Sequence, residues 1–244
     1  MPVAFVIGGA RRLGRSITQR LASHGYDVGI TYNTSGDLAA SLKSEVELHG
    51  CRLTHVQCDV RSEQQLKHAW TQLTANLGLP AVVIVAAGVF PDPQHPGTIS
   101  SEQFIDTMRI NTLPLILLTG MYTTVCDEAK TTGRVISLGS LGATEIWKDR
   151  LLYNASKAAA RTSALSLARS LAPTLSVNIV APGAISQPHD MTDADKRLIP
   201  AERIPMQRHG SDQDVCDAVM FFTSAPHYIT GQTIYVDGGY GLTR

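Results

Sequence analysis

Residues 3–17 read Val-Ala-Phe-Val-Ile-Gly-Gly-Ala-Arg-Arg-Leu-Gly-Arg-Ser-Ile, and this stretch decides the fold. Its first five residues form an apolar run of strand length, and the glycine-containing segment after them opens a stretch with helical spacing. A strand that turns sharply into a helix begins a βαβ unit, in which the next strand lies parallel to the first. The stretch therefore predicts an α/β protein with a parallel sheet.

Apolar runs of strand length recur along the chain, separated by longer segments with helical spacing. The predicted strands are Val3–Ile7, Asp27–Thr31, Arg52–Gln57, Ala81–Val85, Arg134–Leu138, Ser176–Val180 and Thr233–Val236. Runs without polar alternation are typical of strands that helices cover on both faces. We therefore expect one doubly wound domain, residues 1–244, with a seven-stranded parallel sheet flanked by helices.

The composition favours a small-molecule partner. The chain has 21 basic and 21 acidic residues, so it lacks the charge excess that attracts nucleic acid or an anionic membrane. No apolar run approaches the ~20 residues that span a bilayer. The four cysteines show no metal-ligand spacing, and the N-terminus begins a strand rather than a signal peptide. We expect a cytoplasmic protein that binds no metal, nucleic acid or membrane.

The turn after the first strand has the residues of a phosphate-binding loop. Gly8 and Gly14 let the backbone approach a ligand closely, and the N–H groups and positive end of the next helix attract phosphate. The spacing departs from Gly-x-Gly-x-x-Gly, because Arg11, Arg12 and Leu13 stand between the glycines. Two cations there indicate an additional phosphate. Alternatively, the turn is an ordinary strand-to-helix connection.

The end of the second predicted strand distinguishes the two nicotinamide cofactors. An acidic residue at this point binds the adenine ribose diol and repels a 2′-phosphate. The chain instead has Asn33, Thr34 and Ser35, with the first carboxylate at Asp37. Together with Arg12, these residues favour NADPH over NADH. Thr34 and Ser35 can also cap the following helix, and the two roles are compatible.

Tyr153 and Lys157 are four residues apart, so a helix places them on one face. A free tyrosine ionises near pH ~10, and an adjacent ammonium stabilises the phenolate, which makes the phenol a better catalytic acid. Such a pair can protonate a carbonyl oxygen. The same spacing in other helices is a solvated surface pair, so its meaning depends on the motifs around it.

Ser140, thirteen residues before Tyr153, completes a pattern that resembles the short-chain dehydrogenase/reductase family over nearly the whole chain. The first turn resembles the family's Gly-x-x-x-Gly-x-Gly, with Arg12 in place of the middle glycine. Val85 and Ala86 stand where the family usually has two asparagines. The remaining matches, in family order, are Cys58-Asp59-Val60, Ala86-Ala87-Gly88, Asn111, Pro182-Gly183 with Ile185 and Ser186, and Val236-Asp237-Gly238-Gly239.

The resemblance implies a Rossmann-type fold, a nicotinamide cofactor and four catalytic residues. Tyr153 would protonate the carbonyl oxygen, and Ser140 would hold that oxygen by a hydrogen bond. Lys157 would lower the pKa of the tyrosine and bind the nicotinamide ribose, while Asn111 would connect the lysine to solvent. The residues expected to bind the cofactor are Gly8, Arg11, Arg12, Leu13, Gly14, Asn33, Thr34, Ser35, Asp59, Val60, Ala87, Gly88, Tyr153, Lys157, Pro182, Gly183 and Ile185.

Two subgroups of the family compete as models for the substrate. Pteridine reductases resemble the chain in the arginine-bearing first turn and in an aromatic residue near Phe90, which would stack on the pterin. They have an aspartate at the position of Ser140, however, and a hydroxyl there is the usual partner of a ketone. We therefore expect NADPH-dependent reduction of a ketone to an alcohol, as in carbonyl and 3-oxoacyl thioester reductases. A pteridine reductase is the alternative.

Substrate selection is expected to depend on residues without a clear signature. The candidates are Phe90, Trp147, and His189 and Met191 in the proline-containing segment Ser186–Gly210, which we interpret as a flap. Each also has a simpler interpretation. Phe90 can be a loop residue that covers the pocket, Trp147 a subunit contact, and His189 an exposed loop histidine.

The resemblance also implies a homotetramer. The predicted helix is rich in small residues between Ala155 and Leu165, and such a surface lets a second subunit approach closely. The same alanines also favour helix by themselves. A non-catalytic protein that senses NADPH and signals to a partner is the remote alternative, and loss of a catalytic residue would have supported it.

Overall fold

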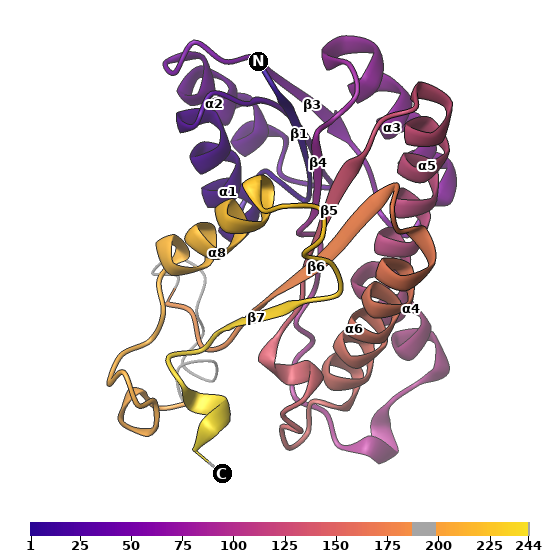
Figure 1. The fold of residues 1–244 in the computed structure, drawn as a ribbon. Helices are drawn as coiled ribbons and strands as arrows, with labels where there is room; N and C mark the ends of the chain where they lie inside the picture. Colours follow the sequence, from indigo (N-terminus) through magenta and orange to yellow (C-terminus); the bar gives the residue numbers. More distant parts are fainter. Residues whose placement is uncertain (187–198, 244) are drawn as a thin grey trace.

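The computed structural model describes residues 1–186 and 199–243. Seven strands of this part form one parallel sheet (Figure 1). Their bounds are β1 (Val3–Ile7), β2 (Asp27–Tyr32), β3 (Leu53–Gln57), β4 (Val82–Val85), β5 (Gly133–Leu138), β6 (Leu175–Pro182) and β7 (Thr233–Val236). Their order in the sheet is β3-β2-β1-β4-β5-β6-β7. The predicted seven-stranded parallel sheet is confirmed.

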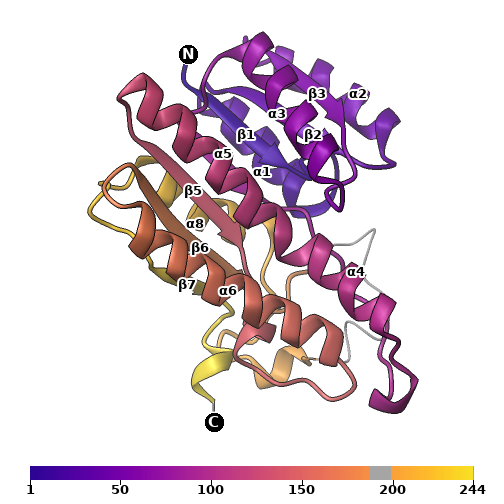
Figure 2. The ribbon, with the colours of Figure 1, turned by 90° about the vertical axis from the view of Figure 1, so that its right-hand side faces the viewer.

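Helices cover both faces of the sheet (Figure 1 and Figure 2). One layer contains α1 (Arg12–Ser23), α2 (Gly36–Glu47) and α8 (Asp212–Ser224). The other layer contains α3 (Glu63–Leu77), α4 (Ser101–Asn111), α5 (Leu113–Ala129) and α6 (Leu151–Leu171). Short 3-10 helices lie in the connections, namely η1 (Pro96–Thr98), η2 (Leu141–Ala143), η3 (Ala201–Arg203) and η4 (Tyr240–Leu242).

Successive residues of β1 enter the two opposite cores. Ala4 and Val6 pack with the cluster that includes α1, α2 and α8, whereas Phe5 and Ile7 pack with the cluster that includes α3, α5 and α6. Side chains of a strand alternate between the faces of the sheet. Because both faces are buried under helices, the strand needs apolar residues at every position, which is why its sequence shows no polar alternation.

The bounds of β1 and β7 are those predicted, and each of the other five strands differs from its prediction by one or two residues at an end. The largest difference is at β6, which continues from the predicted end at Val180 to Pro182. There it still has a parallel neighbour, because Pro182 pairs with Val236 of β7. The end of a strand depends on the partners available in the sheet, and an apolar run cannot report these.

The direction of chain winding reverses between β1 and β4. β1 pairs with β2 on one side and with β4 on the other, so the connections run outward in opposite directions from this point. In open parallel sheets a crevice forms at such a reversal, beyond the carboxyl ends of the strands, and ligands bind in it. The fold therefore places a ligand crevice beyond Ile7 and Val85, the last residues of these two strands.

The predicted flap, Ser186–Gly210, lies partly outside the described residues. Its two ends are joined where the structure describes them. The N–H of Ser186 donates to the carbonyl of Gly210 at 2.8 Å, and the N–H of Gly210 donates to the carbonyl of Ala184 at 2.9 Å. A parallel bridge between Ile185 and Gly210 thus closes the base of the segment.

Candidate active site

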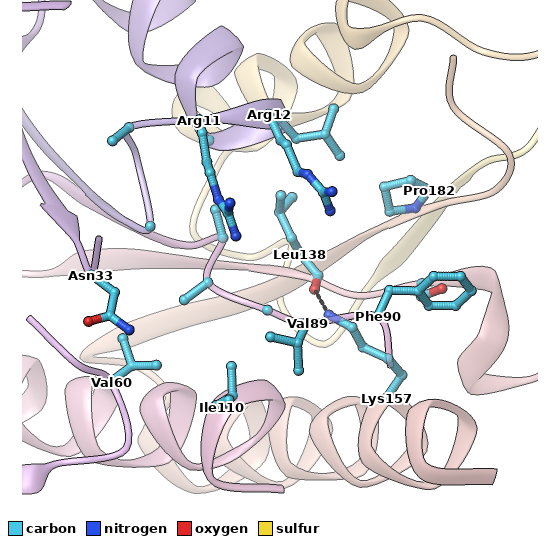
Figure 3. A pocket seen from close by; sticks show the side chains of 18 of the residues that line it. Arg11, Arg12, Asn33, Val60, Val89, Phe90, Ile110, Leu138, Lys157 and Pro182 are labelled. Carbon is cyan, nitrogen blue, oxygen red and sulfur yellow. Dashed lines mark hydrogen bonds between the residues drawn. The ribbon is translucent and has the colours of Figure 1, made fainter. Parts of the chain in front are cut away.

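A cavity of about 540 Å³ opens at this crevice (Figure 3). Its wall contains all seventeen residues predicted to bind the cofactor, together with Ser140, Phe90 and Trp147. Asn111 lies behind the wall, and His189 and Met191 lie outside the described residues. The fold thus brings the predicted phosphate loop and the predicted catalytic residues, which are far apart in sequence, to one continuous cavity.

The first turn is tied to β2. The N–H groups of Gly8 and Gly9 donate to the side chain and the carbonyl of Thr31, each at 3.0 Å. These two groups are therefore not the expected phosphate donors. The first N–H groups of a helix have no acceptor inside it, so Leu13 and Gly14 supply the donors that the start of α1 offers to a phosphate.

Two positions of the first turn have no room for a side chain, because neighbouring backbone packs directly against them. A Cβ on Gly14 would lie 2.0 Å from the carbonyl oxygen of Gly8. A Cβ on Gly8, whose φ is +84°, would lie 2.8 Å from the Cα of Ala87. The turn, α1 and the end of β4 therefore meet backbone against backbone. The two glycines leave backbone without side chains at these points, which lets a pyrophosphate approach the main chain closely.

Arg11 and Arg12 extend from the first turn into the cavity (Figure 3). In Figure 3, Arg11 lies on the side of Asn33, whereas Arg12 lies on the side of Pro182. Arg12 has a left-handed backbone with a φ of +51°, a conformation that favours glycine, in agreement with the middle glycine of the family pattern. Both side chains therefore reach the same cavity, with Arg11 nearer to Asn33 and Arg12 nearer to Pro182 in this view.

The end of β2 contributes amide and hydroxyl groups. Asn33, Thr34 and Ser35 line the cavity, while Asp37 is exposed in the first turn of α2 and is not part of the wall. Ser35 is the N-cap residue of α2, yet its side chain makes no capping hydrogen bond. The capping interpretation of Ser35 is therefore wrong. Thr34 precedes the cap and lines the cavity beside it.

Asp59 brings a carboxylate to the wall after β3, and Arg61 pairs with it. Nη2 of Arg61 lies 2.7 Å from Oδ2 of Asp59, and the backbone N–H of Arg61 donates to Oδ1 at 3.0 Å. The hydrogen bonds from Arg61 lower the pKa of Asp59 by more than burial raises it. Asp59 is therefore ionised and fixed in orientation, with Val60 next to it in the wall.

Tyr153 lies in the first turn of α6 with its ring in the cavity wall. Burial raises the pKa of its phenol, while a hydrogen bond with Ser140 and the positive charge of Arg150 act to lower it. The predicted net lowering of this pKa is wrong, because the loss of hydration around the phenolate outweighs these two contributions. Tyr153 is therefore protonated at neutral pH, as a proton donor must be.

Lys157 is buried one turn further along α6. Its Nζ donates to the carbonyl oxygen of Leu138 at 3.0 Å (Figure 3). The same atom lies 5.9 Å from the ring centroid of Tyr153. Burial lowers the pKa of Lys157 to about 8. The predicted pair does share one face of α6. The positive charge that acts to lower the pKa of Tyr153, against the larger effect of burial, is that of Arg150.

Ser140 follows β5 and is buried beside Tyr153. Its Oγ accepts from the N–H of Gly142 at 3.0 Å, which leaves the hydroxyl proton for another acceptor. A Cβ on Gly142 would lie 3.0 Å from the rings of both Tyr153 and Trp147. Glycine at this position therefore lets both rings pack closely beside the serine.

Asn111 ends α4 and connects two elements behind the cavity. Its Nδ2 donates to the carbonyl of Val89 at 3.0 Å and to Oγ of Ser156 at 2.9 Å, and its Oδ1 accepts from the N–H of Val89 at 2.8 Å. A Cβ on Gly88 would lie 3.3 Å from Oδ1 of Asn111 and 3.6 Å from Nζ of Lys157. Asn111 thus holds the segment after β4 against α6. Its link from Lys157 to solvent stays a prediction.

Three aromatic rings form one end of the cavity. The rings of Phe90 and Tyr153 are packed edge to face, with centroids 4.5 Å apart and an angle of 87° between their planes. Phe90 also meets Trp147 at 6.3 Å and 85°. The rings of Trp147 and Tyr153 are nearly parallel at 6.0 Å. Perpendicular and offset arrangements of this kind are the favourable geometries of aromatic pairs. We call these three residues the aromatic wall.

Some residues of the site were not predicted from the sequence. Arg150 is buried next to the aromatic wall, and its spacing of three residues from Tyr153 would have placed both on one helix face. Val89, Ile110 and Ile199 also line the cavity. These apolar residues carry no chemical group that could have indicated a site.

The part of the chain that the structure describes lacks two kinds of feature. None of its helices combines the length and apolar character needed to cross a membrane. Within residues 1–186 and 199–243, no group of three or more His, Cys, Asp or Glu side chains could hold a metal ion.

The doubly wound fold, the crevice cavity and the Ser-Tyr-Lys group at its end define a Rossmann-type oxidoreductase. Residues 8–241 match the protein family described as Enoyl-(Acyl carrier protein) reductase. The chain belongs to the short-chain dehydrogenase/reductase family, as the sequence motifs predicted.

Relatives of similar length cover almost the whole chain. The 3-oxoacyl-(acyl-carrier-protein) reductase FabG of Staphylococcus epidermidis is 31% identical, over 97% of each chain. The mouse 3-oxoacyl-(acyl-carrier-protein) reductase is 32% identical, over 99% of this chain and 98% of its own. Carbonyl reductase family member 4 of Danio rerio is 29% identical, over 98% of both.

Solved structures share the fold over the same length. A blue fluorescent protein from a metagenomic library, in complex with NADPH, has a TM-score of 0.88 and 29% identity, over 98% of this chain and 97% of its own. Acetoin dehydrogenase from Enterobacter cloacae has a TM-score of 0.89 and 26% identity, over 100% of this chain and 97% of its own.

Proposed function

We propose that this protein reduces a ketone to an alcohol with NADPH and that Tyr153 is the proton donor. The observation that carries the proposal is the continuity of one cavity from Arg11 and Asn33 to Ser140 and Tyr153. A dinucleotide that extends along this cavity would place its reactive ring beside the serine and the tyrosine. The names of the relatives, which include 3-oxoacyl and carbonyl reductases, support a carbonyl substrate.

The proton donor and its neighbours have distinct tasks in this proposal. The nicotinamide of bound NADPH supplies the hydride. Ser140 donates its hydroxyl proton in a hydrogen bond to the substrate oxygen, and Tyr153 transfers its phenolic proton to that oxygen as negative charge develops. Because its pKa is raised, Tyr153 stays protonated before the reaction and has a proton to transfer. Lys157 uses one of its three donors on Leu138, so the other two can bind the nicotinamide ribose.

Preference for NADPH is supported at the end of the cavity near β2. Asn33, Thr34 and Ser35 offer amide and hydroxyl groups there, and Arg11 lies on the same side of the cavity in Figure 3. A planar guanidinium suits a phosphate because it can donate two parallel hydrogen bonds. The sequence pointed to Arg12 for this contact. The placement of the two side chains favours Arg11 for the 2′-phosphate.

Reduction of a pterin is the second candidate, because Arg12 and Phe90 line the same cavity. Stacking of a pterin on Phe90 is restricted, however. The guanidinium carbon of Arg150 lies 4.0 Å from the centroid of the Phe90 ring and covers one of its faces. Only the opposite face could contact a flat heterocycle. Ser140, which suits a ketone oxygen, makes the ketone the stronger candidate.

The test measures oxidation of NADPH and NADH by the full chain with a panel of ketones, 3-oxoacyl thioesters and dihydropterins. We expect turnover with a ketone or thioester, a lower KM for NADPH than for NADH, and a loss of kcat of roughly 10²–10⁴-fold in Tyr153→Phe. Tyr228→Phe is the matched control, because Tyr228 is 98% exposed and its substitution should leave kcat unchanged.

Other outcomes would contradict the proposal in different ways. An unchanged kcat in Tyr153→Phe would show that Tyr153 is not the proton donor. Activity on dihydropterins alone would favour the second candidate. Tight binding of NADPH with no turnover of any compound would instead support a non-catalytic sensor. Equal KM values for NADPH and NADH would contradict the proposed contact between Arg11 and the 2′-phosphate.

A further inference from the structure

Arg150 is a buried cation at the start of α6. Its exposed fraction is 5%, and it lies three residues before Tyr153 as the N-cap residue of the helix. Arginine is seldom buried in proteins unless its charge has partners, because removing a guanidinium from water is costly. The fold therefore holds this side chain in place through specific contacts.

The side chain of Arg150 reaches across to the segment that follows β4. Its guanidinium carbon lies 4.0 Å from the centroid of the Phe90 ring, and its Nη1 donates to the carbonyl oxygen of Pro91. A guanidinium stacked on an aromatic face gains from the ring quadrupole, and more so when water is excluded. A second contact joins the same two segments, because the N–H of Gln94 donates to the carbonyl of Asp149 at 2.9 Å.

The ring that Arg150 holds is part of the aromatic wall. The ring of Phe90 packs against that of Tyr153, with their centroids 4.5 Å apart. A displacement of Phe90 would therefore change the surroundings of the phenol. The positive charge of Arg150 acts to lower the pKa of the phenol. Nζ of Lys157 lies 5.9 Å from the centroid of the Tyr153 ring and donates to the carbonyl of Leu138.

We propose that Arg150 is a positioning residue, which holds Phe90 against Tyr153 and keeps a fixed positive charge beside the phenol. This inference rests on the proposed function, in which Tyr153 donates a proton. It assigns two separable effects to one side chain. The stacked, planar shape of the guanidinium positions the aromatic wall, and its charge stabilises the phenolate that remains after proton transfer.

Other charged groups near Tyr153 have to be considered together with Arg150. Lys157 lies on the same helix, and Ser140 hydrogen-bonds to the phenol. Asp92 and Asp149 line a small recess together with Tyr153 and Arg150. Arg12 lines the main cavity. Among these groups, Arg150 and Ser140 are the ones that act to lower the pKa of the phenol against the effect of burial.

The experiment compares Arg150→Met, Arg150→Lys and Phe90→Leu in the full chain, with Lys148→Met as the control, because Lys148 is exposed in the same loop. The pH profile of kcat for ketone reduction and the KM for the ketone are both measured. The alkaline limb of the kcat profile contains loss of the proton from Lys157, whose pKa is about 8, and from Tyr153, and the tyrosine titration described below assigns the Tyr153 step. In Arg150→Met the Tyr153 step should move to higher pH, because the charge that stabilises the phenolate is gone.

The variants separate charge from shape. Arg150→Lys keeps the charge without the planar stack, so its alkaline limb should stay near that of the wild type while the KM rises several-fold. Phe90→Leu should likewise raise the KM, without the shift of the Tyr153 step to higher pH that is expected in Arg150→Met. Lys148→Met should change neither quantity. An unchanged limb and an unchanged KM in folded Arg150→Met would overturn the proposal, and Arg150→Lys and Phe90→Leu still test the positioning effect if Arg150→Met does not fold.

A second readout does not depend on turnover. NMR of isotope-labelled tyrosine, with the signal assigned by its absence in Tyr153→Phe, follows ionisation of the phenol directly. The titration should occur at higher pH in Arg150→Met than in the wild type and should be unshifted in Lys148→Met. If no ketone is reduced but this shift is found, the proposed function fails while the influence of Arg150 on Tyr153 stands. Equal titration in the two proteins would overturn that influence.

Discussion

Arg12 combines a charged side chain with a backbone that favours glycine. Its φ of +51° lies in the left-handed region, which costs an L-residue roughly 1–2 kcal/mol. Arg11, by contrast, has an ordinary extended φ of −145°. Strained residues of this kind persist where the surrounding structure holds them, and they concentrate at functional sites. Arg12 lines the cavity, so the strain is located where a ligand is expected to bind.

We predict that Arg12→Gly raises the free energy of unfolding by about 0.5–1 kcal/mol, since glycine adopts the left-handed backbone without strain. Urea denaturation measures the change. Arg11→Gly is the matched control and should lower the free energy of unfolding, because it adds flexibility to the unfolded chain without relieving strain. A destabilised Arg12→Gly would show that the arginine side chain contributes more to the fold than its backbone strain costs.

The catalytic group shows how neighbouring residues change a side chain's chemistry. The sequence predicted a tyrosine whose pKa is lowered by a lysine one turn away. In the structure burial raises the pKa of Tyr153, and Lys157 is bonded to a strand carbonyl. The residue types and their helix face were predictable, because spacing determines which residues share a face. Their burial and hydrogen-bond partners were not, because these depend on β5 and on the loop that carries Ser140.

At the scale of elements, the contact between β1 and α1 depends on a glycine. The Cα of Gly14 packs so closely on the preceding turn that a Cβ would lie 2.0 Å from the carbonyl of Gly8. Backbone atoms cannot give way as a flexible side chain can. The helix would have to move away from the strand, and the start of the helix that is expected to face the pyrophosphate would move with it.

Gly14→Ala should therefore lower the free energy of unfolding by about 1–3 kcal/mol, in the range of overpacked cores. It should also weaken NADPH binding. Gly120→Ala is the matched control, because Gly120 lies in α5 with no atom within 4 Å of an added Cβ. The free energy of unfolding of that variant should rise by about 1 kcal/mol, because alanine has a higher helix propensity than glycine. Equal stability of the two variants, measured by urea denaturation, would contradict the packing argument.

At the scale of the whole molecule, the active site affects the stability of the fold through Lys157. Burial lowers the pKa of this lysine to about 8, well below the value near ~10.4 that an unfolded chain gives it. Between these two values the unfolded chain binds a proton that the folded chain does not. The free energy of unfolding must then rise with pH across this window, through the contribution of Lys157.

We predict that Lys157 raises the free energy of unfolding of the wild type by about 1–2 kcal/mol between pH 7 and pH 9.5, in addition to the effects of other groups. Lys157→Met should lack this gain, whereas Lys148→Met, at an exposed position, should retain it. Urea denaturation of the three proteins at both pH values provides the comparison. A parallel pH dependence of wild type and Lys157→Met would show that Lys157 is not desolvated in the folded protein.

Local patterns along the chain were enough to predict most of the strands and the candidate site residues. Apolar runs without alternation, such as Val3–Ile7, specify strands buried on both faces. The glycines of the first turn and the spacing of Tyr153 and Lys157 are local patterns, so they are visible along one chain. For the same reason the family and the seven parallel strands could be predicted.

How these parts act together depends on the tertiary structure. It joins the phosphate loop and the catalytic residues in one cavity, places Arg11 nearer than Arg12 to Asn33, and stacks Arg150 on the ring of Phe90. The physical reason is that burial, hydrogen-bond partners and charge act between residues that are distant in sequence. A pattern along the chain reports what each segment prefers, and the packed sheet and helices determine what each side chain meets.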